Sequence, residues 1–191
     1  MEEALAYQEK YEKYELINGE MHMMSRPSVD HWQTAHNIVN CFGRYLRGKR
    51  CRAFGEVDVF FSEKDNFIPD AMIVCNPDIV KNDGIHGTPD LVVEVLSRST
   101  ARNDKFNKKA LYEKYGVKEY WIVSPSDKTI EIYHLVDGKF ELDDVFAEYR
   151  ESEWRGMTAA EKAEAEAHHT IKVSLYEDFT VEVGDVFRDV D

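Results

Sequence analysis

The chain has 191 residues, of which 43% are hydrophobic and 32% are charged, and its formal net charge is −13. This length is enough for one hydrophobic core, so we expect a single domain over residues 1–191. No apolar run reaches the length of about 20 residues that a membrane helix needs, and the acidic N-terminus does not resemble a signal peptide. The three cysteines contain no CxxC pair, which argues against a disulfide framework and favours the cytoplasm.

The negative charge is concentrated in the C-terminal part of the chain. Residues 141–191 contain fifteen acids and five bases, a net charge of −10. Residues 41–54 contain five bases and no acid, and residues 97–118 contain seven bases and two acids, so each segment carries +5. The total charge argues against a nucleic-acid partner, but these two segments would attract phosphate if the fold brings them together.

The first half of the chain predicts a hairpin, a helix and three strands. Asn18-Gly19 in YELINGEMHMM is typical of a type I′ turn and predicts the hairpin. Apolar residues at helical spacing predict a helix over residues 28–49, with Ser28 or Asp30 as its cap. Strands are expected at residues 51–62, 67–74 and 89–97, and the last has the continuous β-branched character of a central strand.

The second half predicts a helix, two strands and a further helical segment. The helix over residues 100–116 ends at a glycine, and strands at 119–125 and 129–135 flank a polar turn. Residues 143–170 form a helical insertion with a capping box and few apolar residues, which we expect to be an exposed arm or a dimer contact. The order of elements predicts an α/β fold with a mixed central sheet, flanking helices and an N-terminal β-hairpin.

Two acids occur inside apolar strands: Asp70 in NFIPDAMIV and Glu94 in VVEVL. A buried carboxylate is costly unless it is paired or bound to a cation, and two of them on adjacent strands repel each other. A divalent cation between them removes this repulsion, because Mg²⁺ binds carboxylate and water oxygens. A solvated acid at a strand end, for Asp70, and an ion pair with a lysine, for Glu94, are the competing interpretations.

The stretch IPDAMIV, followed by PDLVVEVLSRSTARNDKFNKKALYEKYGVKEYWIVSP, resembles a bacterial family of restriction-endonuclease-like proteins in the PD-(D/E)xK nuclease superfamily. The similarity covers residues 14–142 and returns at 171–187. The resemblance implies a restriction-endonuclease-like fold and a hydrolase, an endonuclease that cleaves DNA with Mg²⁺ or Mn²⁺. It also implies that Asp70 and Glu94 are catalytic metal ligands, with the backbone carbonyl of Val95 as a further ligand.

The lysine of this superfamily usually lies two residues after the glutamate, where this chain has Leu96. The resemblance implies that the lysine has moved to the following helix, where Lys108 matches the position, with Lys105 and Lys109 as fallback candidates. Its ammonium would orient the attacking water or stabilise the pentavalent phosphate. From spacing alone, Lys108 is a lysine on the helix surface.

Four further residues are secondary candidates. His31 matches a histidine near the start of the first helix and would face the metal through water, although a capping or core role is the competing interpretation. Asp104 lies one helical turn before the helix lysine and is expected to orient it. Ser97 and Thr100 lie at a strand-to-helix junction, where hydroxyls and helix amides suit a phosphate oxygen.

We therefore predict a metal-dependent phosphodiesterase that acts on DNA. The alternative is a catalytically inactive nuclease-fold protein that serves as a binding or assembly module, which the missing strand lysine and the charge of −13 favour. RNA or a nucleotide is a third possible substrate. A homodimer is expected, because cleavage of both strands needs two active sites. Four aromatic residues of the second half are interpreted as core packing: Tyr112, Tyr115, Tyr120 and Trp121.

Overall fold

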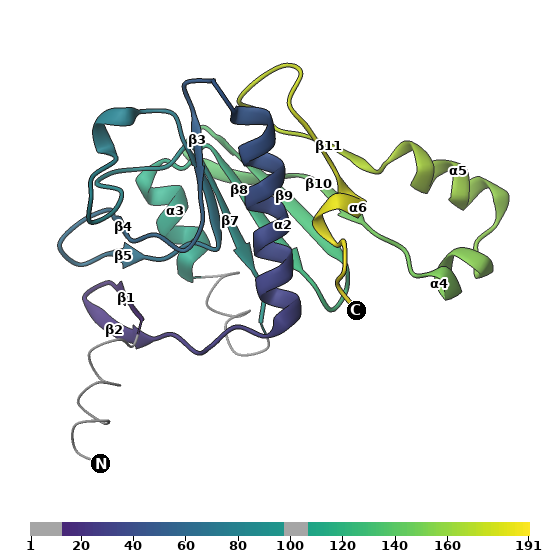
Figure 1. The fold of residues 1–191 in the computed structure, drawn as a ribbon, viewed down its shortest axis with the longest axis horizontal. Helices are drawn as coiled ribbons and strands as arrows, with labels where there is room; N and C mark the ends of the chain where they lie inside the picture. Colours follow the sequence, from purple (N-terminus) through teal and green to yellow (C-terminus); the bar gives the residue numbers. More distant parts are fainter. Residues whose placement is uncertain (1–12, 98–106) are drawn as a thin grey trace, which may run out of the picture.

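The computed structural model describes residues 13–97 and 107–191 and has a six-stranded sheet at its centre (Figure 1). The strand order is β10-β9-β8-β7-β6-β3. These strands span Arg52–Phe54 (β3), Ala71–Val74 (β6), Leu91–Val95 (β7), Glu119–Ser124 (β8), Thr129–Val136 (β9) and Lys139–Ala147 (β10). Neighbouring strands are antiparallel except β7 and β8, which are parallel and joined through the helix α3 (Lys109–Tyr115). The predicted mixed sheet is confirmed.

The N-terminal hairpin belongs to a second, smaller sheet with the order β2-β1-β5-β4. Its strands are Tyr14–Ile17 (β1), Glu20–Met23 (β2), Val59–Phe60 (β4) and Asn66–Phe67 (β5). The hairpin turns at Asn18 and Gly19, whose φ angles of 54° and 83° are those of a type I′ turn. This sheet brings β1 next to β5, which leads into Asp70.

The helix α2 (Val29–Leu46) covers one face of the central sheet, and α3 lies on the opposite side (Figure 1). Ser28 caps α2 by accepting a hydrogen bond from the N–H of His31. Gly116 ends α3 in the left-handed conformation, with φ of 80°. Both predicted helices are therefore present at these places, although residues 98–106 of the second prediction lie outside the described residues.

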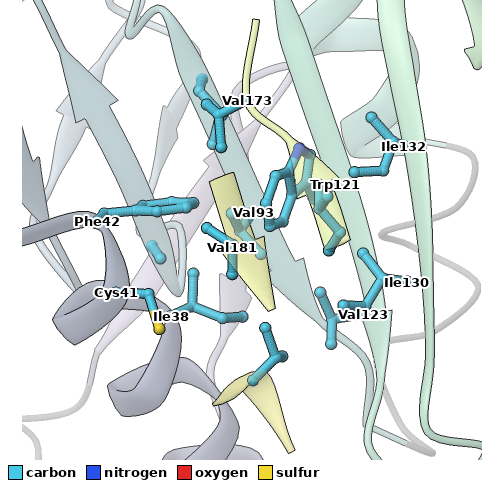
Figure 2. Close-up of a cluster of buried hydrophobic side chains, with 14 of the residues drawn as sticks. Ile38, Cys41, Phe42, Val93, Trp121, Val123, Ile130, Ile132, Val173 and Val181 are labelled. Carbon is cyan, nitrogen blue, oxygen red and sulfur yellow. The ribbon is translucent and has the colours of Figure 1, made fainter. Parts of the chain in front are cut away.

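The larger core lies between α2 and the central sheet. Figure 2 shows Ile38 and Phe42 of α2 facing the strand residues Val93 and Trp121. The rings of Phe42 and Trp121 meet edge to face with 5.4 Å between their centroids, a favoured aromatic geometry. The C-terminal elements close the same core, and they are β11 (Thr170–Lys172), β12 (Thr180–Glu182) and α6 (Val183–Val186).

Two predicted strands are interrupted in the structure. The expected strand at 51–62 divides into β3 and β4, which belong to different sheets, and Gly55 and Glu56 lie between them. The expected strand at 67–74 divides into β5 and β6 because Pro69 has no N–H to donate to a ladder. Instead, the Pro69 carbonyl accepts a hydrogen bond from the N–H of Glu56, which has φ of 52°. Asp70 therefore lies just before β6 rather than inside a strand.

The segment predicted as an insertion begins inside β10, because residues 144–147 pair with β9 and Asp143 lies at a bulge of the same strand. Beyond them, α4 (Glu151–Gly156) and α5 (Ala159–Ala167) extend away from the sheet and bury no residue (Figure 1). Thr158 and Glu161 form the predicted capping box. A short 3-10 turn, η1 (Pro77–Ile79), lies in the expected loop between β6 and β7. Within the described ranges, no helix has the length and hydropathy needed to cross a membrane.

Cys51 and Cys75 form a disulfide across the ends of β3 and β6, next to the paired residues Arg52 and Val74. This disulfide differs from the expectation from the sequence, in which three cysteines without a CxxC pair argued against one. The two cysteines lie close together because β3 and β6, which are separated in the sequence, pair as antiparallel strands. Cys41, a buried residue of α2, is the remaining thiol, and its burial raises its pKa.

Candidate active site

Asp70 and Glu94 lie at the same end of the β6–β7 pair. Ala71 pairs with Val93, and extending this register by one residue places Asp70 opposite Glu94. The N–H of Val95 donates a hydrogen bond of 2.7 Å to Oδ2 of Asp70, which fixes the aspartate beside the residue that follows Glu94. Both acids are buried, with exposed fractions of 8% and 3%. The structure therefore places Asp70 and Glu94 opposite each other on neighbouring segments of the sheet.

Glu94 is held by two side chains from the α3 side of the sheet. Its Oε1 atom accepts hydrogen bonds of 3.1 Å from Nζ of Lys108 and 2.5 Å from the hydroxyl of Tyr112. Lys108 precedes α3 by one residue and is 4% exposed, so it is not a surface lysine. Lys108 is therefore the lysine of a buried cluster that also contains Glu94 and Tyr112. Its neighbour Lys109 instead lies over the ring of Tyr133, 3.3 Å from the centroid.

Glu15 of β1 completes this cluster from the opposite direction. Its Oε1 atom lies 2.8 Å from Nζ of Lys108 and also accepts a hydrogen bond of 2.9 Å from the N–H of Ile68. The side chains of Glu15, Lys108 and Glu94 are each at most 5% exposed. Lys108 therefore bridges two buried carboxylates that come from different sheets.

His31 approaches the aspartate from the first turn of α2. Its Nε2 atom lies 3.4 Å from Oδ2 of Asp70, and its backbone N–H takes part in the helix cap. The candidate histidine therefore does lie beside a predicted metal ligand. The other histidine of α2, His36, stacks on Trp32 with 4.8 Å between the ring centroids.

The remaining predicted residues have different outcomes. Ser97 is half-buried and follows the end of β7 by two residues, which is close to Glu94 in the chain. Thr100 and Asp104 lie outside the described residues, as does Lys105. The carbonyl of Val95 stays a predicted ligand.

The cluster matches the donor chemistry of a hard divalent cation with few protein ligands. Within residues 13–97 and 107–191, no group of three or more His, Cys, Asp or Glu side chains is close enough to hold a metal. Mg²⁺ does not require such a group, because it is commonly bound by one or two carboxylates and several waters. Asp70 and Glu94 are the two carboxylates that the sequence predicts for this role. Together with Glu15 and Lys108, they carry three negative charges and one positive charge, a formal net charge of −2.

Burial of the cluster changes the acidity of Tyr112. Its ring has no exposed surface, and the loss of solvation, together with the adjacent Glu94 and Glu15 carboxylates, raises the pKa of its phenol well above 10.0. The hydroxyl therefore keeps its proton at neutral pH and remains a donor to Glu94.

Glu15 and Tyr112 are the two members that the sequence analysis did not identify. Tyr112 was interpreted as core packing, which describes its ring but not its hydroxyl. Glu15 alternates with Leu16 in a hairpin strand, yet Glu15 and Ile17 are the buried residues of that strand. A glutamate on the same side of a strand as a buried isoleucine is a usable signal once the inward face is known.

The two basic segments belong to different parts of the fold. Residues 41–54 include the end of α2 and the strand β3, whereas the described part of residues 97–118 includes α3, on the opposite side of the central sheet from α2. Several bases are also paired within the chain. Nη2 of Arg44 lies 3.1 Å from Oδ2 of Asp185, and Nζ of Lys118 lies 2.7 Å from Oδ1 of Asp90.

Comparisons with known proteins agree with this architecture. The sequence model of the Uma2 family, described as "Putative restriction endonuclease", matches residues 1–159. The chain is 30% identical over 141 residues to "Uncharacterized protein slr1290" of Synechocystis sp., covering 71% of this chain and 74% of that protein. It is 27% identical over 152 residues to "Uncharacterized protein sll1609" of the same organism, covering 76% and 86%.

A solved structure shares the fold. It is the crystal structure of "a putative nuclease belonging to DUF820" from Anabaena variabilis, which superposes with a TM-score of 0.68 at 19% sequence identity. The match covers 95% of this chain and 94% of the other. At this identity the likeness concerns the fold, whereas the family model covers most of the sequence itself. The chain therefore belongs to the Uma2 family, whose description is "Putative restriction endonuclease".

Proposed function

We propose that this protein is a metal-dependent phosphodiesterase that hydrolyses DNA, with Asp70 and Glu94 as ligands of Mg²⁺ or Mn²⁺. The observation that carries the proposal is the buried acidic cluster at one end of β7, where Asp70 is bonded to the backbone beside Glu94. A net charge of −2 in a largely desolvated cluster favours the binding of a divalent cation. Membership of the Uma2 family and the fold of the solved relative support a nuclease.

The described residues have distinct parts in this proposal. A bound divalent cation supplies Lewis acidity and lowers the pKa of a coordinated water. The ammonium of Lys108 would orient the attacking water or stabilise charge on the phosphate, and the hydroxyl of Tyr112 would hold Glu94 in place. The carbonyl of Val95 is proposed as a further ligand, and Ser97 as a contact for a phosphate oxygen.

The test compares two Pro-Asp pairs in the same chain. Asp70→Asn removes the proposed ligand, whereas Asp90→Asn changes the aspartate of Pro89-Asp90, whose carboxylate accepts hydrogen bonds from Lys118 and from the N–H of Cys75. Both variants are titrated with Mn²⁺ by calorimetry and incubated with supercoiled and single-stranded DNA in Mg²⁺ or Mn²⁺. We expect Asp70→Asn to lose cation binding and cleavage, and Asp90→Asn to retain both.

A purified wild-type protein that binds neither cation and cleaves no DNA would contradict the proposal. It would favour the second candidate, a nuclease-fold binding or assembly module. That candidate has a structural observation in its favour, because Lys108 and Tyr112 already bond to Glu94 in a closed cluster. Cleavage of RNA in place of DNA would redirect the substrate but not the metal chemistry.

We also propose a homodimer, because the described part of each chain contains one such acidic cluster and cleavage of a duplex needs two. The arm formed by α4 and α5 buries none of its own residues and is available for such a contact. Light scattering of the purified protein should give twice the chain mass of 22.2 kDa. A mass of one chain would contradict this part of the proposal.

A further inference from the structure

Among the described residues, Lys108 has two acidic partners, and these are held in place in different ways. Glu94 lies in the central strand β7 beside the proposed metal ligand Asp70, whereas Glu15 lies in the hairpin strand β1. Glu15 is immobilised independently of the lysine, because the N–H of Ile68 donates to the same Oε1 atom at 2.9 Å. Its contact with Nζ of Lys108 is 2.8 Å, shorter than the 3.1 Å contact from Glu94.

A cation on Glu94 would change the surroundings of this lysine. Two positive groups would then share one carboxylate, and their repulsion is strong in a poorly solvated site. An ammonium that is 4% exposed cannot be compensated by water alone. Glu15 is an anion, among the described residues, that can keep Lys108 next to the site once the bond to Glu94 weakens.

We propose that Glu15 is a positioning residue that holds Lys108 beside the metal site while Glu94 binds the divalent cation. This inference rests on the proposed function, and it assigns a role to a residue outside the two carboxylates of the metal site. Glu15 acts through the lysine and does not itself touch the cation. When Glu15 is absent, Lys108 has Glu94 as its remaining described carboxylate partner and competes with the cation for it.

A double-mutant cycle separates this role from a purely structural one. The affinity for Mn²⁺ is measured by calorimetry for the wild type, Glu15→Gln, Lys108→Met and the double variant. We expect Glu15→Gln to weaken binding at least about tenfold, the usual effect of losing a residue that supports a metal ligand. In the Lys108→Met background the same change should weaken binding by less than about threefold, because no ammonium then competes for Glu94.

The control is an ion pair of the same residue types away from the site. Lys139 donates to Glu113 of α3 at 2.6 Å, and Glu113→Gln should leave the affinity for Mn²⁺ unchanged. Thermal unfolding without metal verifies that each variant is folded. If Glu15→Gln does not fold, Glu15→Asp replaces it: the shorter side chain keeps the charge but withdraws it from Nζ, so weaker binding is again expected.

The outcomes distinguish the inference from the proposed function. Equal effects of Glu15→Gln in both backgrounds, or no effect of the Glu15 variants, would overturn the positioning role while leaving a metal site in place. A wild-type protein that binds no Mn²⁺ would instead overturn the proposed function. A large loss that depends on Lys108 would support both.

Discussion

Replacement of Tyr112 by phenylalanine tests the buried cluster with the smallest possible change. The substitution removes one hydroxyl, which donates to Oε1 of Glu94 at 2.5 Å. The ring stays in place, packed edge to face against Phe67 with 5.4 Å between the centroids. Because only one oxygen is lost from a fully buried ring, the measured effect reports the hydrogen bond rather than a cavity.

The expected loss follows from the charge of the acceptor. A hydrogen bond to a charged group contributes about 1.5–3 kcal/mol to stability. Glu94 keeps its bond to Lys108, so the carboxylate is not left without a donor and the lower part of this range applies. A loss of about 2 kcal/mol lowers the melting temperature of a domain of this size by about 4–8 °C. Urea unfolding at pH 7 measures the same quantity as a free energy.

Tyr133→Phe is the matched control. Its hydroxyl donates to Oε2 of Glu131 at 2.6 Å, but both residues are half-buried. Water can replace such a bond, so we expect a loss of less than about 1 kcal/mol. Equal losses in the two variants, or no loss in Tyr112→Phe, would refute the view that Glu94 is a charged acceptor in a desolvated cluster.

The same variant predicts a change in alkaline stability. The pKa of Tyr112 is raised in the folded protein by burial and by the Glu94 carboxylate, whereas the unfolded value is near 10.0. The unfolded state therefore loses its proton first, and stability that is fully present below pH 10 decreases as the pH rises toward the folded pKa. In Tyr112→Phe the loss of stability at alkaline pH should be smaller. Part of the loss should remain, because the pKa of Tyr45 is also raised, to about 12.

Three further changes test the fold away from the site. Gly43→Ala, in α2 with no atom within 4 Å of the new methyl group, should raise stability by about 0.5–1 kcal/mol in urea unfolding. Gly84→Ala should lower the free energy of unfolding by about 1–3 kcal/mol or more. The reason is that φ is +150° and the methyl carbon would lie 2.6 Å from the carbonyl oxygen of Asp58. Glu113→Gln should reduce stability at pH 7 but not far below pH 4.5, because a hydrogen bond from Lys139 lowers the carboxyl pKa and its stabilisation is lost as the pH falls.

The central elements were predictable because their local signals agree with the tertiary structure. α2 has its cap at Ser28 and apolar residues at helical spacing, and both features survive in the fold. The strand at Leu91–Val95 is fully buried, which is what a continuous β-branched run indicates. The hairpin follows from Asn18-Gly19, whose backbone preference is local.

The elements that were missed depend on contacts between distant parts of the chain. β10 carries several acids and has no regular apolar alternation, and it forms because β9 offers a partner. The break after Phe67 has a local cause in Pro69, but the hydrogen bond that its carbonyl accepts from the N–H of Glu56 comes from another segment of the chain. Cys51 and Cys75 become neighbours only when β3 pairs with β6.

The site was predictable in proportion to how unusual each residue is in its sequence context. Asp70 and Glu94 were conspicuous because a charge within an apolar run needs an explanation. Lys108 depended on the family resemblance, because a helix lysine is ordinary in isolation. Tyr112 and Glu15 were hidden, since a buried tyrosine has a sufficient role in packing and a hairpin glutamate has a sufficient role at the surface.

The proposed move of the lysine from strand to helix would explain why this cluster contains an additional acid. A lysine at position 96 would share its strand with Glu94 and project from the same face, since residues two apart in a strand do so. Leu96 occupies that position and packs against the core on the α3 side. Lys108 reaches Glu94 from outside the sheet, so the strand backbone does not fix the position of its ammonium group. A carboxylate close to the ammonium group has to fix that position instead. Glu15 has the required charge, distance and burial. Its removal should therefore leave Lys108 poorly positioned and weaken the binding of the divalent cation.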